Sequence, residues 1–84
     1  MKRLFFTSSF DKAILSTEDV MCEKDILKGE IYLTNKIQWT VFNSVNEVMA
    51  QGEERNVETA KRKIKQTLIK YGAYFEKEYR KYKI

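Results

Sequence analysis

The residues best suited to bind a charged ligand lie in the last third of the chain. Residues 59–84 hold nine lysines and arginines against two acids, Glu76 and Glu78. Cationic side chains at this density are typical of surfaces that bind phosphate groups or acidic proteins. One hypothesis is therefore a nucleic-acid-binding face formed by Arg62, Lys63, Lys65, Lys70, Lys77, Arg80 and Lys81.

The same segment carries aromatic side chains that indicate a different ligand. Aromatic residues left exposed at the end of a helix are typical of protein interfaces. The second hypothesis, which we favour, is a surface that binds another protein through Tyr74, Phe75, Tyr79 and Tyr82.

The sequence lacks the groups that most catalytic and metal sites require. It has no histidine, and Cys22 is its one cysteine, which excludes an internal disulfide and a cysteine-rich zinc site. Glu53 and Glu54 are adjacent, so in a strand they point to opposite sides and form no general acid–base pair. We therefore expect no enzymatic activity, no cofactor and no bound metal.

An amphipathic pattern predicts one long basic helix from Asn56 to Ile84. Asn56 is a favourable N-cap, and Glu58 places negative charge in the first turn. Gly72 can end a helix or be tolerated inside one; because the apolar stripe continues through it in register, we expect one helix, bent at most there. The residues of the stripe recur every three or four positions: Val57, Ala60, Ile64, Leu68, Tyr71, Phe75, Tyr79 and Tyr82.

A helix of this length is longer than the domain that it would cover. About 27 helical residues span roughly 40 Å, whereas a compact domain of this size is about 30 Å across. The turns beyond Gly72 must then be covered by the first strand, by residues 17–28, by a second copy or by another protein.

The pattern of apolar residues in residues 1–55 predicts a sheet. The clearest strands are residues 30–34 and 36–43, whose apolar side chains recur with period two and place Trp39 in the core. Residues 47–51 form a further strand that Gly52 ends. Residues 2–8 also read as a strand, whereas residues 12–17 fit a strand or the start of a helix, and residues 17–28 fit a short helix or an extended segment equally well.

The expected fold is a single α+β domain covering residues 1–84. It consists of a three- to four-stranded antiparallel meander, mainly within residues 1–55, packed on one long C-terminal amphipathic helix, residues 56–84. No apolar run approaches the 18 or so residues of a membrane helix, and the first ten residues are too polar for a secretory signal. We expect an intracellular, cytoplasmic protein with no membrane contact.

The charge distribution and the missing chemistry together suggest the function. Residues 1–58 have a net charge of −3 and residues 59–84 a net charge of +7, so the molecule is a charge dipole. We expect a small non-catalytic protein-binding module, a regulator or inhibitor that occupies the surface of another protein, and an acidic partner would fit the basic helix. The composition, rich in Lys, Ile, Asn and Tyr, is typical of phage and mobile-element accessory proteins. Nucleic-acid binding is the alternative, and a homodimer through the C-terminal helix is compatible with both.

Overall fold

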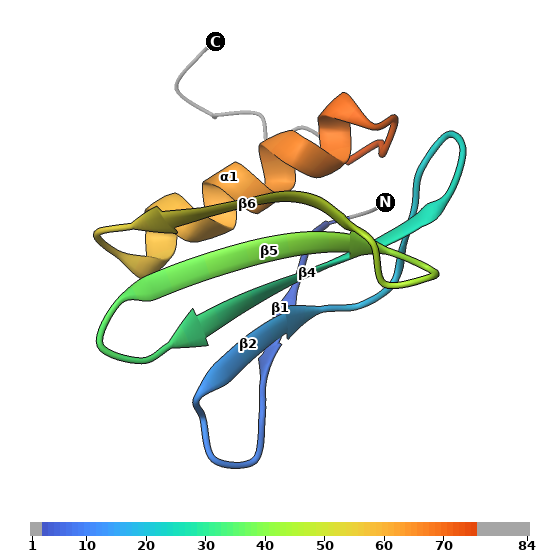
Figure 1. Cartoon of the computed structure of the whole chain (residues 1–84). Coiled ribbons are helices and arrows are strands. Elements are labelled where there is room, and N and C mark those ends of the chain that lie inside the picture. Colours follow the sequence, from blue (N-terminus) through green and yellow to red (C-terminus); the bar gives the residue numbers. More distant parts are fainter. Residues whose placement is uncertain (1–2, 76–84) are drawn as a thin grey trace, which may run out of the picture.

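A computed structural model describes residues 3–75, which form an antiparallel sheet packed against one helix (Figure 1). This confirms the α+β meander, although the described residues contain six strands and not three or four. The sheet order is β1-β2-β4-β5-β6, and β3 pairs with β4 beside β2. The elements are β1 (Phe6–Ser8), β2 (Ile14–Thr17), β3 (Val20–Met21), β4 (Ile26–Leu33), β5 (Ile37–Asn43), β6 (Val48–Glu54) and α1 (Val57–Lys70).

Residues 17–28 are extended and contain no helix. Val20 pairs with Leu27, and both side chains are 1% exposed, so this short hairpin contributes directly to the core. Thr17 is buried as well, and its Oγ1 accepts a hydrogen bond from the Gly29 N–H at 2.9 Å. The segment is therefore fixed by partners across the sheet.

Gly52 does not end its strand, contrary to the prediction. β6 continues to Glu54, and Gly52 pairs with Trp39 on β5. A Cβ atom on Gly52 would lie 2.8 Å from Trp39 Nε1, so the absence of a side chain lets the indole lie flat on the strand. The predicted core position of Trp39 is confirmed, and its Nε1–H donates to Glu54 Oε2 at 3.0 Å.

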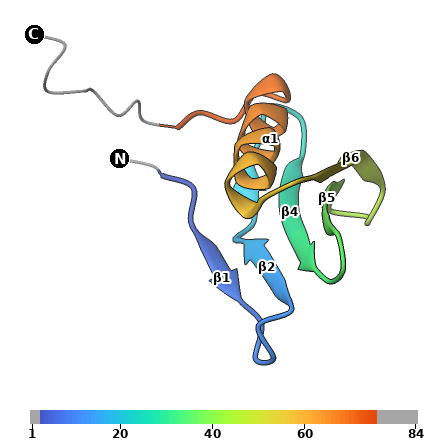
Figure 2. The ribbon, with the colours of Figure 1, turned by 90° about the vertical axis from the view of Figure 1, so that its left-hand side faces the viewer.

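The helix starts where the sequence predicts. The Asn56 side chain accepts a hydrogen bond from the Thr59 N–H at 2.8 Å, which satisfies one of the free N–H groups of the first turn. Ala60, Ile64 and Leu68 are completely buried against the sheet, which curves around α1 when the helix is viewed end-on (Figure 2).

The prediction of one helix from Asn56 to Ile84 is wrong, because α1 ends at Lys70. Gly72 adopts a φ of 102°, its N–H donates to Ile69 O at 2.9 Å, and the Ala73 N–H donates to Leu68 O at 2.9 Å. These two bonds and the left-handed glycine form a Schellman motif, which satisfies the last carbonyls and turns the chain out of the helix. The remaining residues of the predicted helix, 76–84, lie outside the described residues.

Candidate interaction surfaces

The aromatic set predicted to bind a partner is divided by the structure. Tyr74 is 81% exposed, but Phe75 is 7% exposed and belongs to the core. The assignment of Phe75 to a partner surface is therefore wrong, because the turn at Gly72 brings its ring back onto the domain. Tyr79 and Tyr82 lie outside the described residues, as does most of the helix end through which a homodimer was predicted.

The cations predicted to bind nucleic acid are brought together in part. Arg62, Lys63, Lys65 and Lys70 are all exposed on α1, whereas Lys77, Arg80 and Lys81 lie outside the described residues. Lys65 Nζ lies 5.7 Å from the centroid of the Phe75 ring. A fifth helix cation, Lys61, was not in the predicted set and lies over the Phe6 ring at 5.5 Å.

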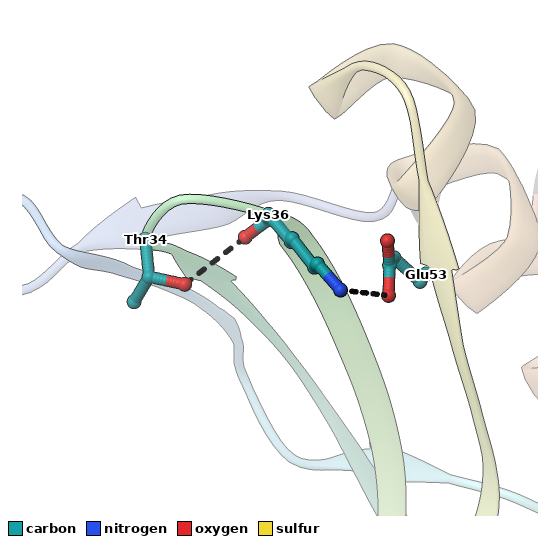
Figure 3. Close-up of polar contacts among 3 residues, drawn as sticks. All are labelled: Thr34, Lys36 and Glu53. Atoms are coloured by element: carbon teal, nitrogen blue, oxygen red, sulfur yellow. Dashed lines mark hydrogen bonds and ion pairs between the residues drawn. The ribbon is translucent and has the colours of Figure 1, made fainter.

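None of these five helix cations has an ion pair with a carboxylate of residues 3–75. The ion pair within that range joins Lys36 Nζ to Glu53 Oε1 at 3.9 Å, and the Thr34 hydroxyl donates to Lys36 O at 3.1 Å in the same turn (Figure 3). Within residues 3–75 the positive charge of α1 is therefore not neutralised by ion pairs, and Arg62, Lys63, Lys65 and Lys70 form a cationic surface on the helix.

One face of the sheet is covered by α1, and the opposite face is covered by no element of the described chain (Figure 2). We call the second face the open face. Cross-strand partners lie on the same face, so the strand register defines its members. They include Ile14 and Ser16 of β2; Ile26, Lys28, Glu30 and Tyr32 of β4; Gln38, Thr40 and Phe42 of β5; and Val48, Gln51 and Glu53 of β6.

The open face is apolar at one end. Met21 pairs with Ile26, and these side chains are 69% and 38% exposed. Phe42 pairs with Lys28 on one side and with Val48, which is 55% exposed, on the other. We call Met21, Ile26, Phe42 and Val48 the apolar end. Sequence reasoning missed this site because its residues come from four strands, and only the register places them together.

A depression of about 310 Å³ lies at the apolar end. Ile26 and Phe42 contribute apolar surface to it, and Asp19 and Lys28 add one carboxylate and one ammonium group. The polar residues Asn43, Ser44 and Asn46 complete the lining. Such a surface can hold an apolar side chain and also hydrogen-bond the groups that flank it.

The opposite end of the open face is polar. The Tyr32 hydroxyl donates a hydrogen bond to Glu30 Oε1, and burial together with this bond raises the pKa of Tyr32 to about 12. The hydroxyl is therefore neutral at physiological pH. A shallow depression of about 410 Å³ lies at this polar end. It is lined by Tyr32, Gln38, Trp39, Thr40, Gln51, Gly52 and Glu53.

Neither a membrane span nor a cluster of metal ligands is found in residues 3–75. No helix in this range is long and apolar enough to cross a bilayer. No three acidic or cysteine side chains of this range are grouped so that they could hold an ion.

Comparisons with protein-family models, with curated proteins and with solved structures find no match for this chain.

Proposed function

We propose that this protein is a non-catalytic protein-binding module that holds its partner on the open face of the sheet. The observation that carries the proposal is the apolar end, where Met21 and Val48 are more than half exposed beside Ile26 and Phe42. Apolar side chains grouped on a rigid sheet and surrounded by polar residues are typical of protein interfaces.

The charge distribution supports an orientation for the complex. Residues 3–55 contain nine acids and six bases, whereas α1 contains five bases and Glu58. A partner seated on the open face meets the acidic layer and leaves the cationic helix in solvent. The partner surface that fits is apolar at its centre and basic at its margin, because opposite charges across an interface favour association and orient it.

Replacing both Met21 and Val48 with lysine is expected to weaken partner binding at least tenfold, since buried apolar contacts at the centre of an interface contribute most of its affinity. The protein is used to capture binding proteins from its host, and each captured protein is then purified and its Kd is measured for wild type and variant. Both side chains are exposed, so the thermal unfolding temperature should stay unchanged.

The matched control is Ile69→Lys, since Ile69 is 50% exposed but lies on α1 in the opposite layer. This variant should bind the captured partner as wild type does. A partner held equally well by the double lysine variant, or one lost with Ile69→Lys alone, would contradict docking on the open face. Docking on the open face would also be contradicted if a photo-cross-linking residue placed at position 48 labelled no partner.

Nucleic-acid binding is the second candidate, and the cations of α1, which form no ion pair with residues 3–75, favour it. Changing Arg62, Lys63 and Lys70 to glutamate is then expected to abolish binding to a labelled 20-nucleotide DNA or RNA, measured by fluorescence anisotropy at about 50 mM salt. If four phosphates are neutralised, the slope of log K against log salt should be about −3 to −4.

The control changes Lys12, Lys24 and Lys28 to glutamate, which alters the net charge equally but leaves α1 intact. This control should retain most of the affinity. Absence of binding by wild type at low salt, or equal loss in both triple variants, would count against a nucleic-acid site on the helix.

A further inference from the structure

The loop of the β1–β2 hairpin displays a fully exposed aromatic ring. Phe10 lies at the tip and has a relative exposure of 104%. In both views this loop lies far from α1, on the opposite side of the domain (Figures 1 and 2). No side chain of the described residues shields the ring, although burying a phenylalanine side chain is worth about 2 to 3 kcal/mol.

The loop that carries Phe10 is held by several internal hydrogen bonds. The Ser9 N–H donates to Ile14 O at 2.8 Å, and the Lys12 N–H donates to Ser9 O at 2.9 Å. Asp11 Oδ1 accepts from the Ser9 hydroxyl at 2.7 Å and from the Ala13 N–H at 3.1 Å. The Ser9 hydrogen bond, followed by the Ala13 N–H, lowers the pKa of Asp11, so the carboxylate that fixes the turn is ionised at neutral pH. A ring held by a preordered loop loses little conformational entropy on binding.

A cavity of about 250 Å³ lies at the other end of the domain. Its lining is mostly apolar and includes Leu27, Met49 and Tyr71, with Cys22 beside them and with Lys24 and Asp25 completing the lining. An apolar cavity of about 150 Å³ already holds a benzene ring, so this one has room for a phenylalanine side chain.

The loop and the cavity of one molecule cannot meet. The Leu33 N–H donates to Ala13 O at 2.8 Å, which places the hairpin loop beside the last residue of β4. Asp25, at the cavity, directly precedes Ile26, the first residue of β4. The eight residues of β4 span roughly 26 Å. The Phe10 ring can therefore enter such a cavity only on a second copy.

The charges beside the two features are complementary. Asp11 and Lys12 flank Phe10, and Lys24 and Asp25 line the cavity. Asp25 Oδ1 accepts from the Ile26 N–H at 2.7 Å and from the Ser44 hydroxyl at 2.9 Å, whereas its Oδ2 accepts no hydrogen bond from residues 3–75. That oxygen can accept a hydrogen bond from the Lys12 ammonium group of another copy. The Lys24 ammonium group can form an ion pair with Asp11 of that same copy.

We propose that the chain associates with itself head to tail, with Phe10 of one copy seated in the cavity between Leu27, Met49 and Tyr71 of the next. Each copy then offers one ring and one cavity, so the contact is heterologous and produces chains or a closed ring. This association does not depend on the proposed function, because it uses neither Met21 nor Val48. The contact is small, so association is expected at protein concentrations of about 0.1–1 mM.

The test is sedimentation velocity over a concentration series. The weight-average mass of wild type should rise with concentration and fall again as salt is added, because the exposed ion pairs are screened. Phe10→Ala should remain monomeric at every concentration with an unchanged unfolding temperature, since no side chain of residues 3–75 shields the ring. A monomeric wild type at 1 mM, or a Phe10→Ala variant that associates equally, would overturn the proposal.

A mixing experiment separates this contact from any other mode of association. Met49→Trp fills the cavity but retains Phe10, whereas Phe10→Ala retains the cavity. Each variant alone should be monomeric, and their mixture should form a dimer of one copy each that grows no further. Lys24→Glu, a change on an exposed side chain that repels Asp11, is a second cavity variant and should weaken wild-type association several-fold. A monomeric mixture together with an unaffected Lys24→Glu variant would exclude the contact.

Discussion

Replacing Ile64 with alanine is expected to remove a substantial part of the free energy of unfolding. Ile64 is completely buried at the centre of α1, and its Cγ2 lies 2.5 Å from the position that a Cβ on Gly29 would take. Deleting a side chain from such a site costs roughly 2–5 kcal/mol, because the apolar contacts are lost and a cavity remains. A domain of this size has roughly 4–13 kcal/mol of stability in total. Urea denaturation followed by circular dichroism measures the difference.

The control for this substitution is Ile69→Ala on the same helix. The chemical change is identical, but Ile69 is 50% exposed, so the loss should be about 0.5 kcal/mol or less. If Ile64→Ala cost less than about 1 kcal/mol, or no more than Ile69→Ala, the helix would not pack on β4 through Ile64 as described.

The parts of the fold that local signals encode could be predicted from the sequence. The strand that holds Trp39 has period-two alternation, and α1 begins at Asn56 because its side chain caps the adjacent turn. By contrast, residues 17–28 are extended because of partners that are distant in sequence. Thr17 accepts a hydrogen bond from the N–H of Gly29, twelve residues away. A contact of this kind produces no periodic pattern of apolar residues from which it could be predicted.

The end of the helix was predicted wrongly because two signals competed. Phe75 falls in register with the apolar stripe, which favours a continuing helix, whereas Gly72 is typical of a helix end. The structure satisfies both patterns without a helix: the chain turns at Gly72, and Ala73 and Phe75 are still buried at 7% exposure. A residue can therefore belong to the core at a helical spacing without being helical.

The candidate surfaces were predictable to different degrees. The cations of α1 follow from composition and periodicity, because a basic residue opposite an apolar stripe faces solvent. The apolar end of the open face does not follow, since Met21 and Val48 are joined only through the pairing of β3, β4, β5 and β6. The exposure of Phe10 likewise depends on the geometry of one loop.

Replacing Gly72 with alanine is expected to destabilise the protein by roughly 2–4 kcal/mol. The φ of 102° lies in the left-handed region, where a residue with a Cβ is strained by about 1–2 kcal/mol. The new Cβ would also lie 2.6 Å from Glu23 Cβ and 2.9 Å from the Glu23 backbone nitrogen, and overpacking of this kind costs about 1–3 kcal/mol. The Glu23 N–H donates to Tyr71 O at 3.1 Å, so any shift also strains the bond that ties the helix end to the sheet. Urea denaturation measures the loss.

A double-mutant cycle with Glu23→Gly isolates the contribution of the Glu23 side chain. Removing the Glu23 side chain deletes the closest contact, so the cost of Gly72→Ala in that background should fall by the contribution of that contact. The remaining cost then contains the backbone strain at position 72 and the 2.9 Å contact with the Glu23 backbone nitrogen. A cost near zero in both backgrounds, accompanied by a stronger helical signal at 222 nm, would mean that the helix continues past Tyr71. The substitution therefore decides between the Schellman turn and the continuous helix that the apolar stripe predicts.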